Sequence, residues 1–431
     1  MPEKFDVIIV GAGPAGSACA LVCVRSGLNV LLLERGEYPG SKNVMGGVLF
    51  SKQLRDLIPE FWKEAPLERP VVDHRYWILG KESVVQIGYK GMEWGEEPYN
   101  SFTVQRAQFD QWFAKKAVEA GALLVNETVV TECIVEKGKV VGVRTDRPDG
   151  ELYADVVVLA DGVNSLLAKQ LGFRKEHPPE NVALCAMEVI NLTKDKINER
   201  FNITENQGVA IEIFGESTRG NFGAAFLYTN KESINIGVGT TLAAMIKEKI
   251  KPYDLLDQLK KHPAIHPLIE GGESVEYLAH LIPEGGYRSV QKVAGNGVVV
   301  VGDAASLVNA MHGEGSNLAM HSGQLAAEAI VQAKKRGDFS ESSLNHYHDA
   351  LNNSFVMKDL EKYKEAPHTF EAYPQYFKAY APMLTKAMGN FFTVDGTPKR
   401  DKQKQIMKSF TAEKGTFRVL TDIYRVWKAV K

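Results

Sequence analysis

The first thirty-four residues constrain the fold more than any other part of the chain. A β-branched run at 7–10 (VIIV) is followed by a glycine-rich turn at 11–16 (GAGPAG) and then by small residues suited to a helix. A second apolar run at 30–33 (VLLL) ends at Glu34, 18 residues after Gly16. This succession of strand, turn, helix, strand and terminal acid predicts a βαβ unit that binds a dinucleotide.

Each glycine of the turn has a distinct predicted role. Gly11 permits the tight turn, Gly13 lets the backbone approach a pyrophosphate, and Gly16 lets the helix pack closely on the strand. Glu34 can accept hydrogen bonds from an adenosine ribose, and its charge disfavours the 2′-phosphate of NADP. This unit alone leaves FAD and NAD open. The other predicted contacts of this unit are Pro14, Ala15 and Arg35.

Two later segments favour a flavin. Residues 154–160 (ADVVVLA) predict a buried strand that runs into the turn 161–165 (DGVNS). Residues 297–301 (GVVVV) predict another strand, which leads into 302–305 (GDAA) and then into the loop 313–317 (GEGSN) and a helix. An acid at such a strand end can bind a ribityl hydroxyl, and the small residues leave room for an isoalloxazine ring. Together the three segments predict FAD as the cofactor.

These motifs resemble those of the glutathione-reductase-related flavoproteins, which include aromatic hydroxylases, geranylgeranyl reductases and electron-transfer-flavoprotein:quinone oxidoreductases. The resemblance is strongest to the FixC branch of the last group and covers essentially the whole chain. It includes 103–112 (TVQRAQFDQW) and the branch-specific block 391–396 (FFTVDG). It implies an α/β fold: an FAD-binding Rossmann domain with an inserted antiparallel β-sheet domain and a C-terminal helical module.

The resemblance also implies roles for single residues. Arg106, at a helix start, would be directed at the FAD phosphates or the flavin, with a surface salt bridge as the alternative. The backbone of Val130 would meet the adenine, and Asp303 would bind the ribityl chain. The helix after 313–317 would point its positive end at the pyrimidine side of the flavin and favour an anionic reduced ring. The remaining predicted FAD contacts are Asp161, Gly162, Gly302, Gly313, Gly315, Ser316 and Asn317.

Departures from related patterns narrow the function. Hydroxylases carry D-G-x-x-S-x-x-R, and here the last position is Ala168, which weakens an NADPH-dependent hydroxylase reading. Residues 176–290 hold no second G-x-G-x-x-G unit, and the chain has no C-x-x-C pair. No cysteine follows Cys185, so the cysteine-bound cluster of full-length quinone oxidoreductases has no ligands in this chain.

No side chain is assigned as catalytic, and no metal site is predicted. His312, Glu314 and His321 lie beside the predicted flavin. They could handle a quinone proton or serve as ordinary hydrogen-bonding residues, because no metal-ligand spacing or paired acid supports more.

The resemblance implies an FAD-dependent dehydrogenase that accepts electrons from a two-subunit electron-transfer flavoprotein. It would pass them to a membrane quinone within a FixABCX-type bifurcating complex that includes a small ferredoxin-like iron–sulfur subunit. Two alternatives stay open: a geranylgeranyl-reductase-like enzyme acting on prenyl lipids, and a non-enzymatic FAD-containing assembly subunit.

The predicted division has three parts. The predicted FAD-binding domain consists of residues 1–60, 101–175 and 289–340. The predicted mainly β insertion consists of residues 61–100 and 176–288, and the predicted helical module consists of residues 341–431. The chain has 51 Lys and Arg residues against 53 Asp and Glu residues, so no overall excess of positive charge suggests nucleic-acid binding.

The predicted location is cytoplasmic and peripheral on the inner face of the membrane, because no signal peptide is evident and no apolar run approaches the roughly 18 residues that span a bilayer. The aromatic segment 370–392 could meet lipid, line a quinone entrance or dock on the protein's own sheet. Residues 395–431 carry ten Lys or Arg against four Asp or Glu, a net charge of +6. This basic tail could be a solvated face, or it could meet an anionic leaflet or an acidic ferredoxin-like subunit.

Overall fold

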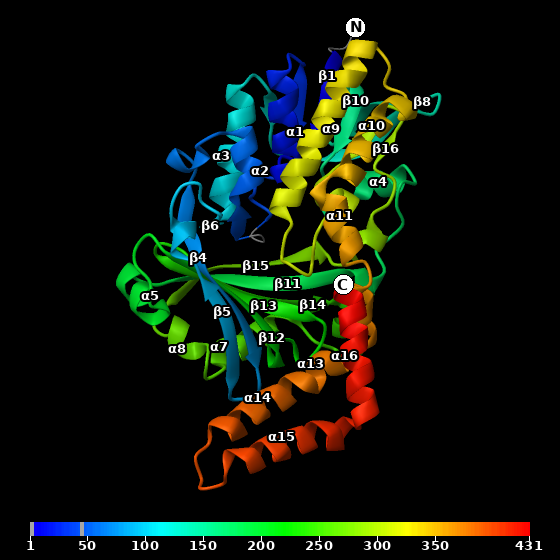
Figure 1. The fold of residues 1–431 in the computed structure, drawn as a ribbon. Coiled ribbons are helices and arrows are strands. Elements are labelled where there is room, and N and C mark those ends of the chain that lie inside the picture. The colour runs from blue at the N-terminus through cyan, green and yellow to red at the C-terminus, as the bar shows by residue number, and fades with distance from the viewer. Residues whose placement is uncertain (1–3, 44–46) are drawn as a thin grey trace. The chain divides into compact units, whose positions relative to one another are not determined.

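The computed structural model describes residues 4–43 and 47–431 (Figure 1). The chain forms two compact units, each built from three separate segments. The first contains residues 1–68, 99–182 and 280–361, and the second contains 69–98, 183–279 and 362–431. The three-part division predicted from the sequence remains a proposal, and here residues 362–431 group with the sheet of the second unit.

The first unit is built on a mostly parallel sheet in the order β16-β17-β10-β1-β2-β7. Helices pack against this sheet, so its strands read as nearly continuous runs of Val, Ile and Leu. β16 is antiparallel to β17, and β8 and β9 extend β10 as an antiparallel meander. The strands are β1 (Lys4–Val10), β2 (Val30–Leu33), β7 (Leu123–Val125), β8 (Val130–Glu136), β9 (Lys139–Thr145), β10 (Glu151–Leu159), β16 (Ala294–Gly295) and β17 (Val298–Val300).

Helices α1 (Pro14–Arg25) and α9 (Ser316–Arg336) run side by side in this unit (Figure 1). Their close approach depends on Gly323, where an added Cβ would lie 2.1 Å from the carbonyl oxygen of Ala15. The phenol of Tyr347 donates to the carbonyl of Val300, which ties a further helix to the sheet. The unit also contains α2 (Ser51–Leu57), α3 (Arg106–Glu119), α4 (Leu166–Gln170), α10 (Glu341–Asn353), most of α11 (Phe355–Lys362) and the hairpin of β3 (Val48–Phe50) with β6 (Ser101–Val104).

The second unit is a mainly antiparallel sheet in the order β15-β11-β14-β13-β12-β4, with β5 paired to β4. One face carries alternating Ile, Leu and Val side chains that pack in an apolar core with four helices. The strands are β4 (Leu67–Leu79), β5 (Val84–Lys90), β11 (Val182–Asn191), β12 (Gly208–Gly215), β13 (Gly223–Thr229), β14 (Ser233–Thr241) and β15 (Glu273–Pro283). The helices are α5 (Lys194–Phe201), α6 (Leu242–Glu248), α7 (Pro252–Lys261) and α8 (His266–Ile269).

The opposite face of this sheet is aromatic. Phe214 of β12 stacks on Phe377 at 6.4 Å, and Phe222 stacks on Phe370 at 5.9 Å. Part of the segment 370–392 therefore docks on the protein's own sheet, whereas Phe392 at its end is 70% exposed. The segment forms α12 (Ala366–Ala372), α13 (Gln375–Lys378) and α14 (Tyr380–Phe392).

Two further helices, α15 (Lys399–Lys414) and α16 (Thr416–Val430), follow the aromatic segment. Within the described residues, every helix is too short or too polar to cross a bilayer. The predicted combination of an α/β Rossmann-type domain, an antiparallel sheet and a helical C-terminal region is confirmed.

Candidate flavin site

The predicted cofactor residues gather at one edge of the first unit's sheet. The register pairs Val10 at the end of β1 with Leu33 of β2 and with Leu159 of β10, and it pairs Leu159 with Val300 of β17. The carboxyl ends of these parallel strands therefore lie at one level, where open α/β sheets bind their ligands. The predicted residues that follow these strand ends are Gly11, Glu34, Asp161, Gly162, Gly302 and Asp303.

Two glycines of the glycine-rich turn pack against the protein's own backbone, and the third faces open space. Gly11 has φ +103°, and a Cβ there would lie 2.3 Å from the carbonyl oxygen of Ala160. A Cβ on Gly16 would lie 1.9 Å from the carbonyl oxygen of Gly11. At Gly13, by contrast, no described atom lies within 4 Å of the Cβ position. The open space at Gly13, next to Pro14 and Ala15 in the first turn of α1, fits a pyrophosphate at a helix N-terminus.

Glu34 is held in place by the backbone around it. Its Oε2 accepts from the N–H of Ala12 at 3.0 Å, and its Oε1 accepts from the N–H of Gly36 at 2.7 Å. Each oxygen keeps a second lone pair for a ribose hydroxyl. Arg35 is exposed beside it, and Val130 lies half-buried at the start of β8.

Arg106 begins α3 and forms a bidentate ion pair with Asp110, with both N–O distances at 2.8 Å. Both side chains are buried, so this is not the exposed salt bridge that was the alternative. Burial raises the pKa of Asp303 to about 6, and the positive charge of Arg106 opposes that rise. Arg106 therefore acts electrostatically on Asp303 as well as holding Asp110.

Three elements meet at Gly302. Its N–H donates to Ser322 Oγ of α9 at 2.9 Å, and a Cβ on it would lie 2.9 Å from Ala15 Cβ of α1. α9 starts after Gly315 without a side-chain cap, so the first N–H groups, including that of Ser316, have no capping side chain. Asn317 is buried, and its Oδ1 has no partner within the described chain. Free donors and an unpaired acceptor at one helix start fit the polar edge of a flavin.

The loop before α9 holds the three residues considered for proton handling or ordinary hydrogen bonding. Gly313 has φ +62°, and Glu314 accepts through Oε2 from the side-chain amide of Asn317 at 3.2 Å. The ring of His321 packs on Phe355 at 5.1 Å, and burial lowers the pKa of this imidazole. His312 is exposed. These contacts are structural ones, and the proton-handling interpretation of Glu314 and His321 stays a prediction.

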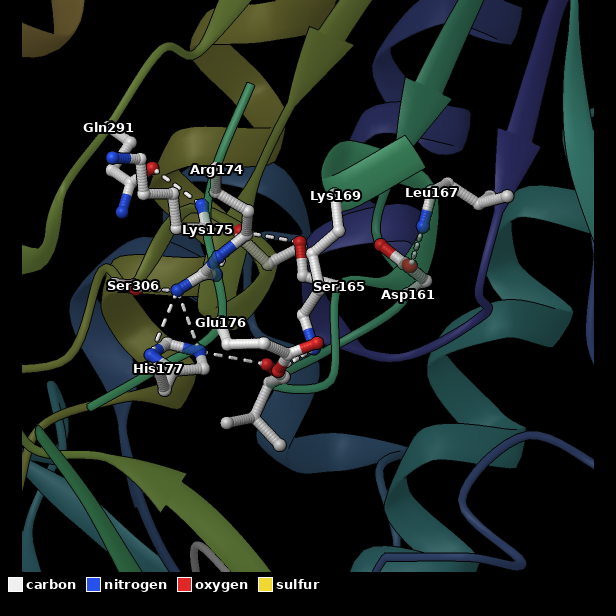
Figure 2. A network of polar contacts seen from close by, with 12 residues as sticks. Asp161, Ser165, Leu167, Lys169, Arg174, Lys175, Glu176, His177, Gln291 and Ser306 are labelled. Carbon is white, nitrogen blue, oxygen red and sulfur yellow. Dashed lines mark hydrogen bonds and ion pairs between the residues drawn. The ribbon is translucent and has the colours of Figure 1, made fainter. Parts of the chain in front are cut away.

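A polar network centred on Arg174 holds the segment after Asp303 (Figure 2). The carbonyl oxygen of Ala304 accepts from Arg174 Nη1 at 2.8 Å and from Ser165 Oγ at 3.0 Å. Arg174 Nη2 donates to Ser306 Oγ at 3.1 Å and lies 2.6 Å from the His177 ring. Burial, and then the charge of Arg174, lower the pKa of His177 to about 4. The imidazole is therefore neutral at pH 7 and can accept from the arginine.

Sequence reasoning missed Arg174, His177 and Ser306. One signal was available, because Arg174 follows six residues after Ala168, the position at which the hydroxylase motif has its arginine. Ala168 and Arg174 line the same small cavity, so the structure brings an arginine to the region where the motif lacks one.

Asp161 lies at the other end of this network (Figure 2). Burial raises its pKa to about 6. Its Oδ2 accepts from the N–H of Leu167 at 3.4 Å, whereas its Oδ1 is buried without a partner in the described part of the chain. A buried carboxylate oxygen without a donor fits a ligand that brings one. Together with Gly13, Glu34 and the start of α9, this edge of the sheet fits FAD.

Comparison with known proteins agrees with this geometry. A family model described as an FAD binding domain matches residues 4–354, and one described as the ETF-QO/FixC family C-terminal domain matches residues 366–431. The chain is 49% identical to Protein FixC of Bradyrhizobium diazoefficiens over 99% of both chains. It is 41% identical to a protein of Escherichia coli named "Probable electron transfer flavoprotein-quinone oxidoreductase YdiS", over 94% of both chains.

A solved structure supports the fold. A geranylgeranyl bacteriochlorophyll reductase-like protein from Thermoplasma acidophilum superposes with a TM-score of 0.74 at 19% identity, covering 95% of this chain and 96% of that one. At this identity the match concerns the fold alone. The end-to-end identity to FixC proteins and the two family models together establish that the chain belongs to the ETF-QO/FixC family and is an FAD-dependent flavoprotein oxidoreductase of electron transfer.

Proposed function

We propose that the chain accepts electrons from a two-subunit electron-transfer flavoprotein and passes them to a membrane quinone. The match of residues 366–431 to the ETF-QO/FixC C-terminal domain carries this proposal, because it lies outside the FAD-binding segment shared by many flavoproteins. The name of the E. coli relative, which is similar over 94% of both chains, supports the same reaction.

The resemblance adds a small ferredoxin-like iron–sulfur subunit and a bifurcating complex to the proposal. In the described residues, no group of three or more His, Cys, Asp and Glu could hold a metal. The four cysteines are free thiols. In such a complex this chain would be the high-potential exit for electrons, at the inner face of the membrane.

The bound flavin supplies the electron-transfer chemistry, and the side chains of this protein bind and orient it. The open turn at Gly13 and the carboxylate of Glu34 would hold the adenosine diphosphate part. Asp303 and the start of α9 would orient the flavin end. Arg174 would keep the segment after Asp303 in place through the carbonyl of Ala304 and the hydroxyl of Ser306.

An anaerobic experiment with the FAD-loaded chain tests the proposal. Reduced electron-transfer flavoprotein should bleach the visible flavin absorbance stoichiometrically, and a water-soluble quinone analogue should then restore it. Omitting the electron-transfer flavoprotein, or offering NADPH in its place, is the control and should leave the flavin oxidised. A flavin that no form of electron-transfer flavoprotein reduces would contradict the proposal.

The same preparation distinguishes the alternatives. Hydrogenation of a prenyl chain without the electron-transfer flavoprotein would favour the geranylgeranyl-reductase-like enzyme. Bound FAD that turns over with no combination of reductant and quinone analogue would favour the assembly subunit.

A further inference from the structure

Helix α16 is oriented with its charged side toward the protein. Asp422 is buried, and its carboxylate accepts from the phenol of Tyr380 at 2.9 Å and from Arg425 at 3.0 Å. The phenol of Tyr376 donates to the backbone carbonyl of Asp422 at 3.0 Å. The guanidinium of Arg425 lies 4.4 Å from the ring centre of Tyr373. These contacts fix which face of α16 is turned inward.

The apolar side of the same helix is consequently turned outward. Five large apolar side chains recur at helical spacing and are between 52% and 85% exposed. At 3.6 residues per turn they occupy one side of the helix, opposite Asp422, over a length of about 15 Å. We call this set the outer stripe, and it consists of Phe417, Leu420, Ile423, Tyr424 and Trp427.

This arrangement is the reverse of an ordinary surface helix, in which the apolar stripe faces the core and charged residues face water. A contiguous exposed apolar stripe marks an interaction surface.

The charges beside the outer stripe are positive. Lys428 is exposed on α16, and the ammonium of Lys431 lies 4.7 Å from the ring centre of Trp427. The acid of α16, Asp422, is buried on the other side. An occupant of this surface must therefore be apolar in the middle and negative at the edges.

We propose that the outer stripe of α16 inserts into the interface of an anionic lipid bilayer. The rings of Trp427 and Tyr424 suit the headgroup level, where an amphipathic ring keeps its polar tip in water. Flanking Lys side chains can reach lipid phosphates while their methylene stems lie on apolar surface. The inference rests on the proposed function, because delivery of electrons to a quinone dissolved in the membrane requires contact with the bilayer.

An acidic protein subunit also has negative charge, but the surface favours lipid. The outer stripe is a single row of aliphatic and aromatic side chains that runs the length of the helix, which is the pattern of helices that lie in the plane of a membrane interface. The charged side chains beside it, Lys428 on α16 and Lys431 at its end, are cationic, which suits a layer of lipid phosphates.

Vesicle binding of the full FAD-loaded chain tests the inference. The wild type should co-sediment with vesicles of phosphatidylcholine and phosphatidylglycerol, and only weakly with phosphatidylcholine alone. The double variant Leu420→Glu/Ile423→Glu should lower the partition coefficient about tenfold or more, because two charges replace apolar contacts with the acyl boundary. The matched control is Ile246→Glu, because Ile246 on α6 is also an exposed isoleucine of the second unit, and it should bind as the wild type does.

Fluorescence locates the contact. Lipids brominated on the acyl chain should quench the tryptophan emission of the wild type on binding, and Trp427→Phe should lose most of that quenching. Equal vesicle binding by the wild type and the double variant, or quenching that Trp427→Phe does not change, would overturn the inference. Loss of binding to a ferredoxin-like iron–sulfur subunit with vesicle binding intact would also overturn it and assign the stripe to that subunit.

The water-soluble quinone assay separates this inference from the proposed function. Reduction of the analogue by a chain that does not bind vesicles would overturn the membrane contact alone. Vesicle binding by a chain that never passes electrons to any quinone would overturn the proposed function alone.

Discussion

A carboxyl group on the aromatic face of the second unit's sheet makes the stability of the protein depend on pH. Glu212 lies on β12, and the residues opposite it are Tyr76 on β4 and Phe226 on β13. Tyr228, two residues beyond Phe226, stacks on that ring at 4.8 Å. Burial in this setting raises the pKa of Glu212 from its ordinary 4.5 to about 7.

The size and sign of the effect follow from that pKa. A rise in the pKa from 4.5 to about 7 corresponds to roughly 3 kcal/mol of unfolding free energy, because each pKa unit is worth about 1.4 kcal/mol. The folded chain holds the proton more tightly than the unfolded chain. This contribution is therefore fully present below pH 4.5 and is lost as the pH rises through about 7.

The variant Glu212→Gln keeps the shape of the side chain and removes the titration. Relative to the wild type, it should become more stable as the pH rises from about 5 to about 8.5, by up to roughly 3 kcal/mol. Urea unfolding at saturating FAD, followed by circular dichroism at each pH, measures this difference. The exposed Glu276 on β15 offers the matched control Glu276→Gln, which should show a much smaller change. Parallel stability curves for Glu212→Gln and the wild type would refute the reasoning.

Three further predictions concern the flavin site. Gly13→Ala should fold normally but bind FAD more weakly. Gly16→Ala should disrupt the turn itself, because a Cβ on Gly16 would lie 1.9 Å from a backbone oxygen, whereas a Cβ on Gly13 meets open space. Titration of FAD into folded apoprotein distinguishes the two variants. Arg174→Met should raise the FAD dissociation constant about tenfold or more, because a hydrogen bond from a charged donor contributes about 1.5–3 kcal/mol. The same variant should shift the flavin midpoint potential. Arg174→Lys should restore part of both, and unchanged values in Arg174→Met would contradict the assigned positioning role. Wild-type FAD affinity should rise with pH through about 6 as Asp303 and Asp161 ionise. Asp303→Asn should weaken this dependence, and the exposed control Asp349→Asn should leave it unchanged.

Much of the FAD-binding unit could be predicted because its determinants are local. The strand residues 7–10, the turn 11–16 and Glu34 lie within one βαβ unit, in which spacing along the chain fixes spacing in the fold. The later strands 154–160 and 297–301 could be expected beside β1 because buried parallel strands are recognisable as apolar runs. The FAD contacts of single residues remain predictions, although the structure gathers most of them at one sheet edge.

The contacts that depend on distant segments were out of reach. Arg174 lies six residues beyond the arginine position of the hydroxylase motif, and its role appears only because folding brings it to Ala304 and Ser306, more than a hundred residues later. The aromatic segment 370–392 left three interpretations open, and only the stacking of Phe370 and Phe377 on the sheet shows what part of it does.

The sequence by itself determined the cofactor class, the α/β order of strands and helices, and the family. Each of these depends on spacing between residues that are close in the chain, or on motifs that follow one another in a fixed order. The tertiary structure decided which side of an element is buried. Helical period places Leu420 and Trp427 on one side of α16 and Asp422 on the other, but it does not say which side faces inward. The phenol of Tyr380 and the other partners of Asp422 decide that, because a carboxylate supplied with donors can be buried and leaves the apolar side to face outward.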